Sequence, residues 1–122
     1  NQRLVRQACA NCRTETGIED SVRQSLSATG AVLDPDIKFV KGNGCPLCNS
    51  EGFKGRVGVF ELLVMNQRVK AAIAAEADMN EVRHAAMDGS YVSLSRYASS
   101  LLNQGLTTPD ELLRILPRNQ QP

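Results

Sequence analysis

Two short stretches decide the fold: Cys9-Ala10-Asn11-Cys12 and Cys45-Pro46-Leu47-Cys48. They hold all four cysteines of the 122-residue chain, as two C-x-x-C pairs separated by 32 residues. A two-residue spacing lets a tight turn aim two sulfurs at one ion, and two such turns complete a tetrahedron with Zn–S distances of about 2.3 Å. Gly44 and Pro46 favour the second turn, because glycine admits unusual backbone angles and proline fixes φ. The spacing predicts one closed structural zinc site and no catalytic residue in this chain.

Three other uses of the cysteines are less compatible with the pattern. Two disulfides need an oxidising compartment, and the sequence carries no sign of export. A redox C-x-x-C needs one motif at a helix start within a βαβ unit, which two paired motifs do not resemble. An iron–sulfur site is possible from the ligands alone, although the spacings favour zinc. We expect Arg6, Arg13 and Lys41, which are close to the pairs in sequence, to offset the negative charge of four thiolates.

The composition is that of an ordinary globular chain, with 42% hydrophobic and 22% charged residues. This length suits one domain, or one domain with a small appendage. Only 4% of the residues are aromatic, so the core must be mostly aliphatic. The formal charge of +1, which four thiolates and one Zn²⁺ would turn into −1, argues against a nucleic-acid-binding surface. No apolar run approaches the roughly 20 residues needed to span a bilayer.

The pattern along the chain predicts an α+β fold that is mostly α. Residues 1–8 read as a short helical turn or a strand end leading into Cys9. We expect strands over 37–41 and 56–65, and helices over 18–29, 69–77, 78–89, 95–104 and from 109 onward. The helix starts rest on Asp78 with Glu81, a capping box, and on Thr108-Pro109 with Glu111. The expected parts are a small zinc-knuckle element, a short strand pair and a C-terminal helical bundle.

A few polar residues outside the cysteine pairs are candidates for a role. Arg56 lies between two glycines on the expected strand, either solvated or in contact with the zinc loop or a neighbouring subunit. Glu61, on the same strand, is a possible partner for it. His84, the only histidine, is expected to be an ordinary exposed or satisfied helix residue, and Arg114 to lie on a solvated face.

Three blocks in this order resemble a known family. They are Gln2-Arg3-Leu4-Val5-Arg6 leading into Cys9; Gly44 to Cys48 followed by Gly52-Phe53-Lys54-Gly55-Arg56 and on to Leu63; and Gly105 to Arg114. Together they are similar to the C-terminal part of the secretion ATPases of type II secretion and type IV pilus assembly systems. Phe53 stands where the family more often has tyrosine.

The resemblance implies that the chain is a piece of a RecA-like ATPase. Residues 1–5 would end a segment of the ATPase core, 6–52 would form the zinc element, 53–116 would complete the core, and 117–122 would be a disordered tail. The chain has no G-x-x-x-x-G-K-[ST] loop, so ATP and Mg²⁺ would bind only in the upstream part of the parent protein. The start without Met or signal pattern fits an excised domain.

The same resemblance implies a cytoplasmic homo-hexamer, peripheral to the bacterial inner membrane, that acts through a membrane platform protein without inserting itself. Gln2 and Arg3 would then lie near nucleotide in the parent. Two rival functions stay open at this point: a nucleic-acid-binding zinc module, and a stand-alone zinc-stabilised protein-interaction domain. The upstream sequence would separate them from an ATPase.

Overall fold

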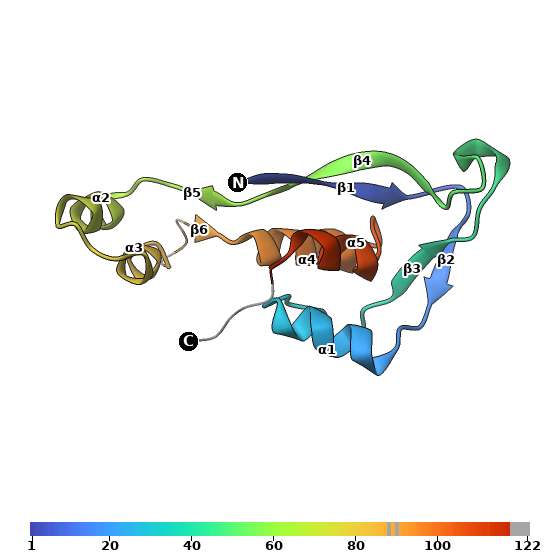
Figure 1. Ribbon diagram of the computed structural model, residues 1–122, viewed down its shortest axis with the longest axis horizontal. Helices are drawn as coiled ribbons and strands as arrows, with labels where there is room; N and C mark the ends of the chain where they lie inside the picture. Colours follow the sequence, from blue (N-terminus) through green and yellow to red (C-terminus); the bar gives the residue numbers. More distant parts are fainter. Residues whose placement is uncertain (88, 90, 118–122) are drawn as a thin grey trace.

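A computed structural model describes residues 1–87, 89 and 91–117. The described chain is elongated (Figure 1). A long pair of strands lies over three helices in the middle, the cysteine loops lie at one end, and a helical hairpin lies at the other. Of the residues expected as a disordered tail, 117–122, all but Pro117 fall outside the described part.

The structure is α+β, as the sequence predicts. Its described residues form five α-helices: α1 (Asp20–Ala28), α2 (Gln67–Ala74), α3 (Met79–Ala85), α4 (Leu94–Asn103) and α5 (Pro109–Ile115). The strands are β1 (Gln2–Ala8), β2 (Arg13–Thr16), β3 (Phe39–Gly42), β4 (Phe53–Phe60), β5 (Leu62–Leu63) and β6 (Tyr91–Val92). A single 3-10 turn, η1 (Pro46–Cys48), carries the second cysteine pair.

The start of the chain is a full strand rather than a helical turn. β1 pairs antiparallel with β4, with Val5 opposite Val57 and a register shift between Arg6 and Ala8. β1 is rich in polar residues and has little hydrophobic signal of its own, so the long-range ladder with β4 makes it a strand. This pairing brings the residue before Cys9 next to Phe53, five residues after the second cysteine pair.

Two shorter antiparallel pairs extend the fold in opposite directions. β2 pairs with β3. β2 leads from the first cysteine pair toward α1, and β3 leads from α1 back to the second cysteine pair. β5 pairs with β6 at the base of the α2–α3 hairpin. The strand expected over 56–65 is therefore divided: β4 begins earlier, at Phe53, and Glu61 separates it from β5.

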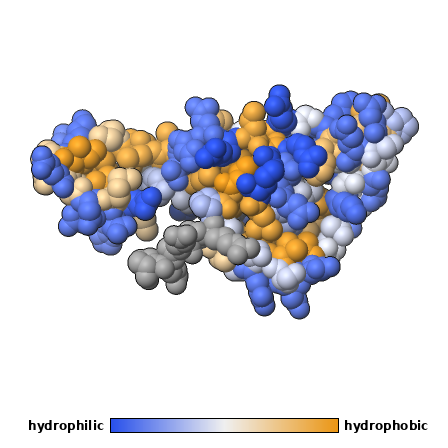
Figure 2. All heavy atoms as spheres, in the orientation of Figure 1, coloured by the Kyte–Doolittle hydropathy of each residue, from blue (hydrophilic) through white to orange (hydrophobic). Residues whose placement is uncertain are grey.

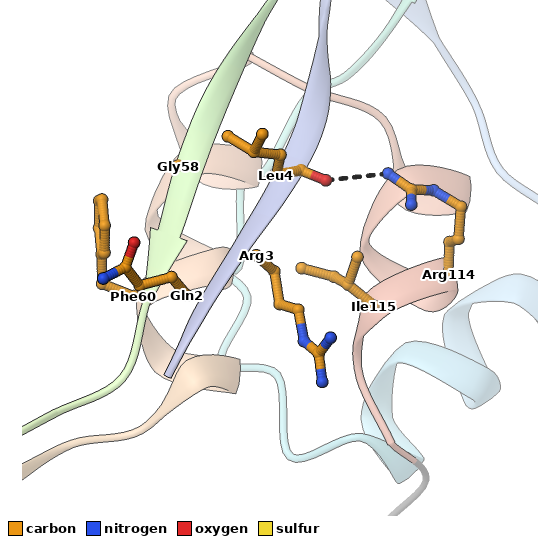
Figure 3. Close-up of a pocket in the computed structure, with 7 residues that line it drawn as sticks. All are labelled: Gln2, Arg3, Leu4, Gly58, Phe60, Arg114 and Ile115. Carbon is orange, nitrogen blue, oxygen red and sulfur yellow. Dashed lines mark hydrogen bonds between the residues drawn. The ribbon is translucent and has the colours of Figure 1, made fainter.

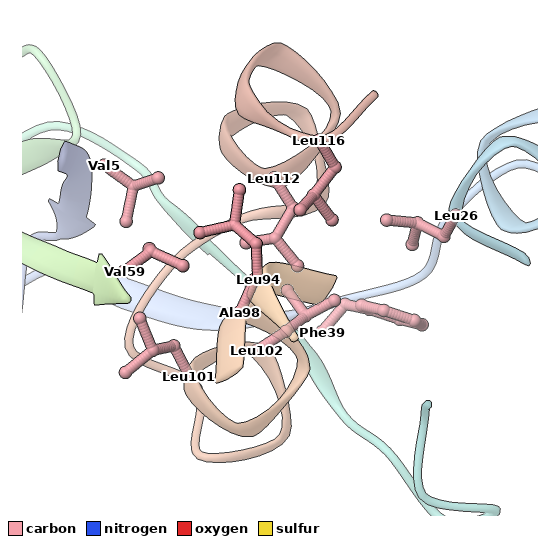
Figure 4. Packing of buried hydrophobic residues seen from close by; sticks show 10 residues of the cluster. All are labelled: Val5, Leu26, Phe39, Val59, Leu94, Ala98, Leu101, Leu102, Leu112 and Leu116. Atoms are coloured by element: carbon pink, nitrogen blue, oxygen red, sulfur yellow. The ribbon is translucent and has the colours of Figure 1, made fainter. Parts of the chain in front are cut away.

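The hydrophobic core lies between the β1–β4 pair and three of the helices (Figure 4). It is almost entirely aliphatic, as the composition predicts, and its buried members are Val5, Leu26, Phe39, Val59, Leu94, Ala98, Leu101, Leu102, Leu112 and Leu116. Burying one valine or leucine side chain fully contributes about 1.5–3 kcal/mol relative to leaving it in water. Because these residues come from β1, α1, β3, β4, α4 and α5, the cluster joins both halves of the chain.

The helices begin where local capping predicts. Asn66, Asp78 and Ser93 each accept a hydrogen bond from a backbone N–H of the turn that follows, and Asp78 with Glu81 forms the expected capping box. Gly105, in the left-handed region with φ of +71°, follows the C-cap of α4. α3 ends at Ala85, before the expected stop at Gly89.

The helices form two groups instead of the single bundle expected. α4 packs on β4, while α5 contacts both α1 and β1. α2 and α3 pack on each other as a hairpin beyond β5 and β6, at the opposite end of the molecule from the cysteines (Figure 1). Much of this hairpin and of the strand before it is hydrophobic at the surface (Figure 2), with Val64, Met65, Ile73, Met79 and Met87 exposed. No helix in the described ranges has the length and apolar character to cross a membrane.

Candidate metal centre

The two cysteine pairs are brought together by the two antiparallel ladders. Cys9 directly follows β1, and Cys12 directly precedes β2. The second pair, Cys45 and Cys48, flanks the 3-10 turn between β3 and β4. Since β1 pairs with β4 and β2 with β3, the loops that connect these strands meet at one end of the molecule (Figure 1).

The four sulfurs are arranged as a tetrahedral metal site requires. All four Sγ atoms lie within 4.8 Å of one another. The Sγ atoms of Cys9 and Cys45 are 3.8 Å apart, those of Cys12 and Cys48 are 3.8 Å apart, and those of Cys45 and Cys48 are 3.6 Å apart. Zn–S bonds of about 2.3 Å in a tetrahedron give S···S edges of about 3.8 Å. The cysteines are free thiols and not disulfides.

Backbone N–H groups surround the second cysteine pair. Gly44 donates to the Sγ of Cys12 at 3.3 Å, while Cys45 and Gly52 donate to the Sγ of Cys48 at 3.2 and 3.3 Å. Such donors stabilise sulfur in its charged form without bringing in a side chain. Both glycines have positive φ, +94° at Gly44 and +79° at Gly52, which explains why glycine is needed at these points.

A close backbone contact closes the base of the second cysteine loop. Gly42 and Gly52 touch, so that a Cβ added to Gly42 would overlap the carbonyl oxygen of Gly52. The N–H of Cys9 donates to that same carbonyl at 3.0 Å, which ties the first cysteine pair to the end of the second loop. The glycines therefore act in the assembly of the site and not as a phosphate-binding loop.

The thiol pKa values move in opposite directions within the cluster. A hydrogen bond from the Asn11 side chain lowers the pKa of Cys45 to about 6, against the effect of burial. Burial raises the pKa of Cys12 to about 11, because its charged form loses hydration. Four thiolates this close repel one another, and a bound divalent cation supplies the charge that would keep all four ionised.

The arginines that are close to the cysteines in sequence bind other groups than the cysteine sulfurs. Arg6 binds Glu111 and lies over the ring of Phe53, 4.0 Å from its centroid. Arg13 donates to the carbonyl oxygen of Gly105 at 2.9 Å. Within the described part of the chain, neither these residues nor Lys41 donates to a cysteine sulfur. The expectation that these basic side chains offset the thiolate charge therefore has no direct contact to support it and stays a prediction.

The turn after α4, residues 105–107, is hydrogen-bonded to the chain on both sides of the first cysteine pair. The N–H of Ala8 donates to the carbonyl oxygen of Leu106 at 2.9 Å, and the Thr107 hydroxyl donates to the carbonyl oxygen of Arg6 at 2.8 Å. With the bond from Arg13 to Gly105, residues 105–107 hold both sides of the first cysteine loop. The sequence around Gly105 does not indicate these contacts, because they join segments about a hundred residues apart.

The other candidates lie away from the cysteine cluster. Arg56 is exposed on β4, where it is paired opposite Arg6, and its side chain makes no hydrogen bond or ion pair within the described residues. Glu61 does not bind Arg56; it accepts from the Tyr91 hydroxyl at 2.8 Å and from the Leu94 N–H at 3.3 Å. His84 is exposed on α3, in the hairpin at the far end.

An open pocket of about 720 Å³ lies at the N-terminal end of β1 (Figure 3), and its lining includes Gln2, Arg3 and Arg114. Arg114 is not simply solvated as expected, because its Nη2 donates to the Leu4 carbonyl oxygen at 3.0 Å and to Glu111 at 3.1 Å. The pocket is separate from the cysteine cluster, so it does not extend the candidate metal centre.

Glu111 is a structural residue that the sequence did not reveal. The spacing from Thr108 predicted a helix cap, yet Thr108 makes no side-chain capping bond. The Glu111 carboxylate instead faces β1, where it accepts hydrogen bonds from the Arg6 backbone and guanidinium. Only the three-dimensional approach of α5 to β1 identifies this pair.

Comparison with known proteins agrees with the geometry. Residues 1–114 match the family described as Type II/IV secretion system protein. The chain is 28% identical to the type IV pilus assembly ATPase TfpB of Acinetobacter baylyi over 95% of its own length and 20% of that protein. It is 31% identical to the type IV pilus assembly ATPase PilB of Thermus thermophilus, over 93% of this chain and 13% of the relative.

A third relative is the type II secretion system protein E of Aeromonas hydrophila, 32% identical over 93% of this chain and 22% of that protein. The chain thus spans about a fifth or less of the length of these curated relatives. Because the family match covers almost the whole sequence, from before the first cysteine pair to the last turn of α5, this chain belongs to the type II/IV secretion system protein family.

Proposed function

We propose that this chain is the C-terminal, zinc-binding portion of an ATPase that drives protein secretion or pilus assembly. The observation that carries the proposal is the cluster of four Sγ atoms within 4.8 Å, in a chain of the type II/IV secretion system protein family. Cys9, Cys12, Cys45 and Cys48 would hold one Zn²⁺ ion. Four thiolates fill the tetrahedral shell and leave no position for water, so the ion would be structural and not catalytic.

The metal would act by fixing the loops that the glycine contacts bring together. Zinc bound at four sulfurs connects the end of β1, the start of β2 and both ends of η1. Few large apolar side chains lie around the cysteine loops themselves, where Val40 is half-buried and Leu47 is 58% exposed. Metal binding would therefore supply much of the folding free energy of the element.

We further propose which segments of the chain belong to the ATPase core and which form the zinc element. Residues 1–5 end a strand of a RecA-like ATPase core, 6–52 form the zinc element inserted after it, and 53–116 return to the core. The burial of Val5 with Val59 and Leu112 in one cluster supports this division, since the chain leaves and re-enters the same core on neighbouring strands. The parent would bind ATP and Mg²⁺ upstream of this chain.

The parent protein would work as a cytoplasmic homo-hexamer at the inner membrane, coupled to a platform protein. The names of the relatives, which include pilus assembly ATPases and a type II secretion protein, support a part in pilus assembly or secretion. Within it, the zinc element would organise contacts with a neighbouring subunit or the platform protein. Its position at one end of the molecule, away from the α2–α3 hairpin, suits a docking role (Figure 1).

The test uses the full-length parent with Cys9→Ser and Cys45→Ser, and Leu47→Ser as the matched control in the same loop. Zinc content, nucleotide affinity, hexamer content and secretion are measured separately. We expect the cysteine variants to lose zinc, assembly and secretion, with nucleotide affinity kept. Loss of nucleotide binding in a still-folded protein with normal assembly would place the element in the ATPase site and contradict the proposal.

A further inference from the structure

A groove of about 560 Å³ lies where the zinc element meets α1 and α5. Its floor and walls include the half-buried apolar side chains of Ile18, Val22, Val40 and Phe53. These residues come from the start of α1, from β3 and from the start of β4, so the groove exists only when the zinc element is folded against the rest of the chain. Its size is in the range of pockets that bind ligands or peptide side chains.

The rim of the groove carries an excess of negative charge. Glu19, Glu51 and Asp110 line it with exposed carboxylates, against one lysine, Lys41. Among the described residues, neither Glu51 nor Asp110 has an ion-pair partner. Arg6, whose guanidinium lies over Phe53, is already bound to Glu111 and does not neutralise the rim.

One wall of the groove also holds an unsatisfied polar group. Thr108 is only 8% exposed, and its Oγ1 is buried with no hydrogen-bond partner in the described part of the chain. Buried hydroxyl groups are normally hydrogen-bonded, and an unpaired one costs free energy. Because Oγ1 has less than 1 Å² of accessible surface, it would donate to a peptide carbonyl in the groove only after the Thr108 side chain rotates toward that carbonyl.

We propose that this groove docks a basic segment of a partner protein, with a large apolar side chain between lysines or arginines. The apolar walls take the hydrophobic side chain, and the three carboxylates pair with the flanking cations. The same charge disfavours nucleic acid and anionic membrane surfaces, which would meet like charge. The proposal rests on the docking role proposed above and names the chemistry of the partner.

The test is an NMR titration of the ¹⁵N-labelled, zinc-loaded chain with the peptide acetyl-Lys-Arg-Leu-Phe-Lys-Arg-amide. We expect the backbone signals of Ile18, Val40, Phe53 and Thr108 to shift together and to saturate. The acidic counterpart, acetyl-Glu-Asp-Leu-Phe-Glu-Asp-amide, should bind far more weakly. Glu51→Lys should weaken the basic peptide by about fivefold or more. Glu76→Lys, with the same charge change in the hairpin at the other end, should leave it unaffected.

Several outcomes would overturn the proposal: no saturable shift, shifts on another surface, equal binding of the acidic peptide, or full affinity in Glu51→Lys. Shifts of the same groove signals by phosphatidylglycerol vesicles or by RNA would assign the groove to a membrane or to nucleic acid instead. Asp110→Asn serves as the second variant if Glu51→Lys does not fold. Zinc is measured on each sample, so that a zinc-loaded chain without peptide binding refutes the groove alone, and a folded chain without zinc refutes the metal site alone.

Discussion

Arg6 and Glu111, at opposite ends of the sequence, are joined by three hydrogen bonds. The Arg6 backbone N–H donates to Glu111 Oε2 at 2.7 Å, and its Nε and Nη2 donate to Oε1 at 3.0 and 2.9 Å. The Glu111 side chain is only 3% exposed, while that of Arg6 is 56% exposed. The pair fixes α5 to β1 just before the first cysteine, and so links the last helix to the start of the zinc element.

Removing the charge of Glu111 should destabilise the fold. Glu111→Gln keeps the size of the side chain but weakens the bonds from Arg6 and Arg114. Hydrogen bonds to charged groups contribute about 1.5–3 kcal/mol, and the exposure of Arg6 to water places the expected loss in the lower part of that range. Urea unfolding measures it. Glu76→Gln, at an exposed glutamate, is the control and should change stability by about 0.5 kcal/mol or less. Equal stability of the two variants would mean that the pair does not hold α5 to β1.

The same pair predicts how stability depends on pH. Burial alone would raise the pKa of Glu111, but the donors of Arg6 and then of Arg114 hold it below its usual 4.5. A carboxyl whose pKa is lowered by folding contributes its full stability above pH 4.5 and loses it as pH falls through the folded value. The free energy of unfolding of the wild-type chain should therefore fall more steeply below pH 4.5 than that of Glu111→Gln. Parallel curves for the two proteins would contradict this account.

Loss of one cysteine should unfold the cysteine loops and the β2–β3 pair while sparing α4. Cys45→Ser removes a ligand, and metal binding is expected to supply much of the folding free energy of these loops. Amide hydrogen exchange should show lost protection in β2 and β3, with protection kept in α4. Leu47→Ser, at an exposed position within the same loop, should behave as wild type. Chelation of zinc should reproduce the cysteine variant, and an unchanged melting curve after chelation would count against the metal's role.

Gly42 offers a test of the loop contact that does not touch a ligand. A methyl group at Gly42 would overlap the carbonyl oxygen of Gly52, so Gly42→Ala must push apart the two ends of the second cysteine loop. We expect weaker zinc binding in competition with a chelator. Gly17→Ala is the matched control, since a Cβ there has no neighbour within 4 Å. If both alanine variants bound zinc equally well, the close packing of the loop ends would not matter to the site.

The sequence was most informative where the signal is local. The cysteine pairs, the cap at Asp78 and the Pro109 start of α5 depend on residues a few positions apart, and the structure has them as predicted. β2 was not predicted, and β1 was predicted only as one of two alternatives, because their polar residues become strands only by pairing with β3 and β4. The Arg6–Glu111 pair was missed for the same reason: more than a hundred residues separate partners that only the folded chain brings together.

The central claim is that four cysteine sulfurs bind a single zinc ion. X-ray absorption at the zinc edge, with elemental analysis of the same purified chain, tests it most directly. The account predicts one zinc per chain, bound by four sulfur atoms at about 2.3 Å, with no nitrogen or oxygen ligand. Iron in place of zinc, a mixed ligand shell, or a metal-free chain with two disulfides would contradict it.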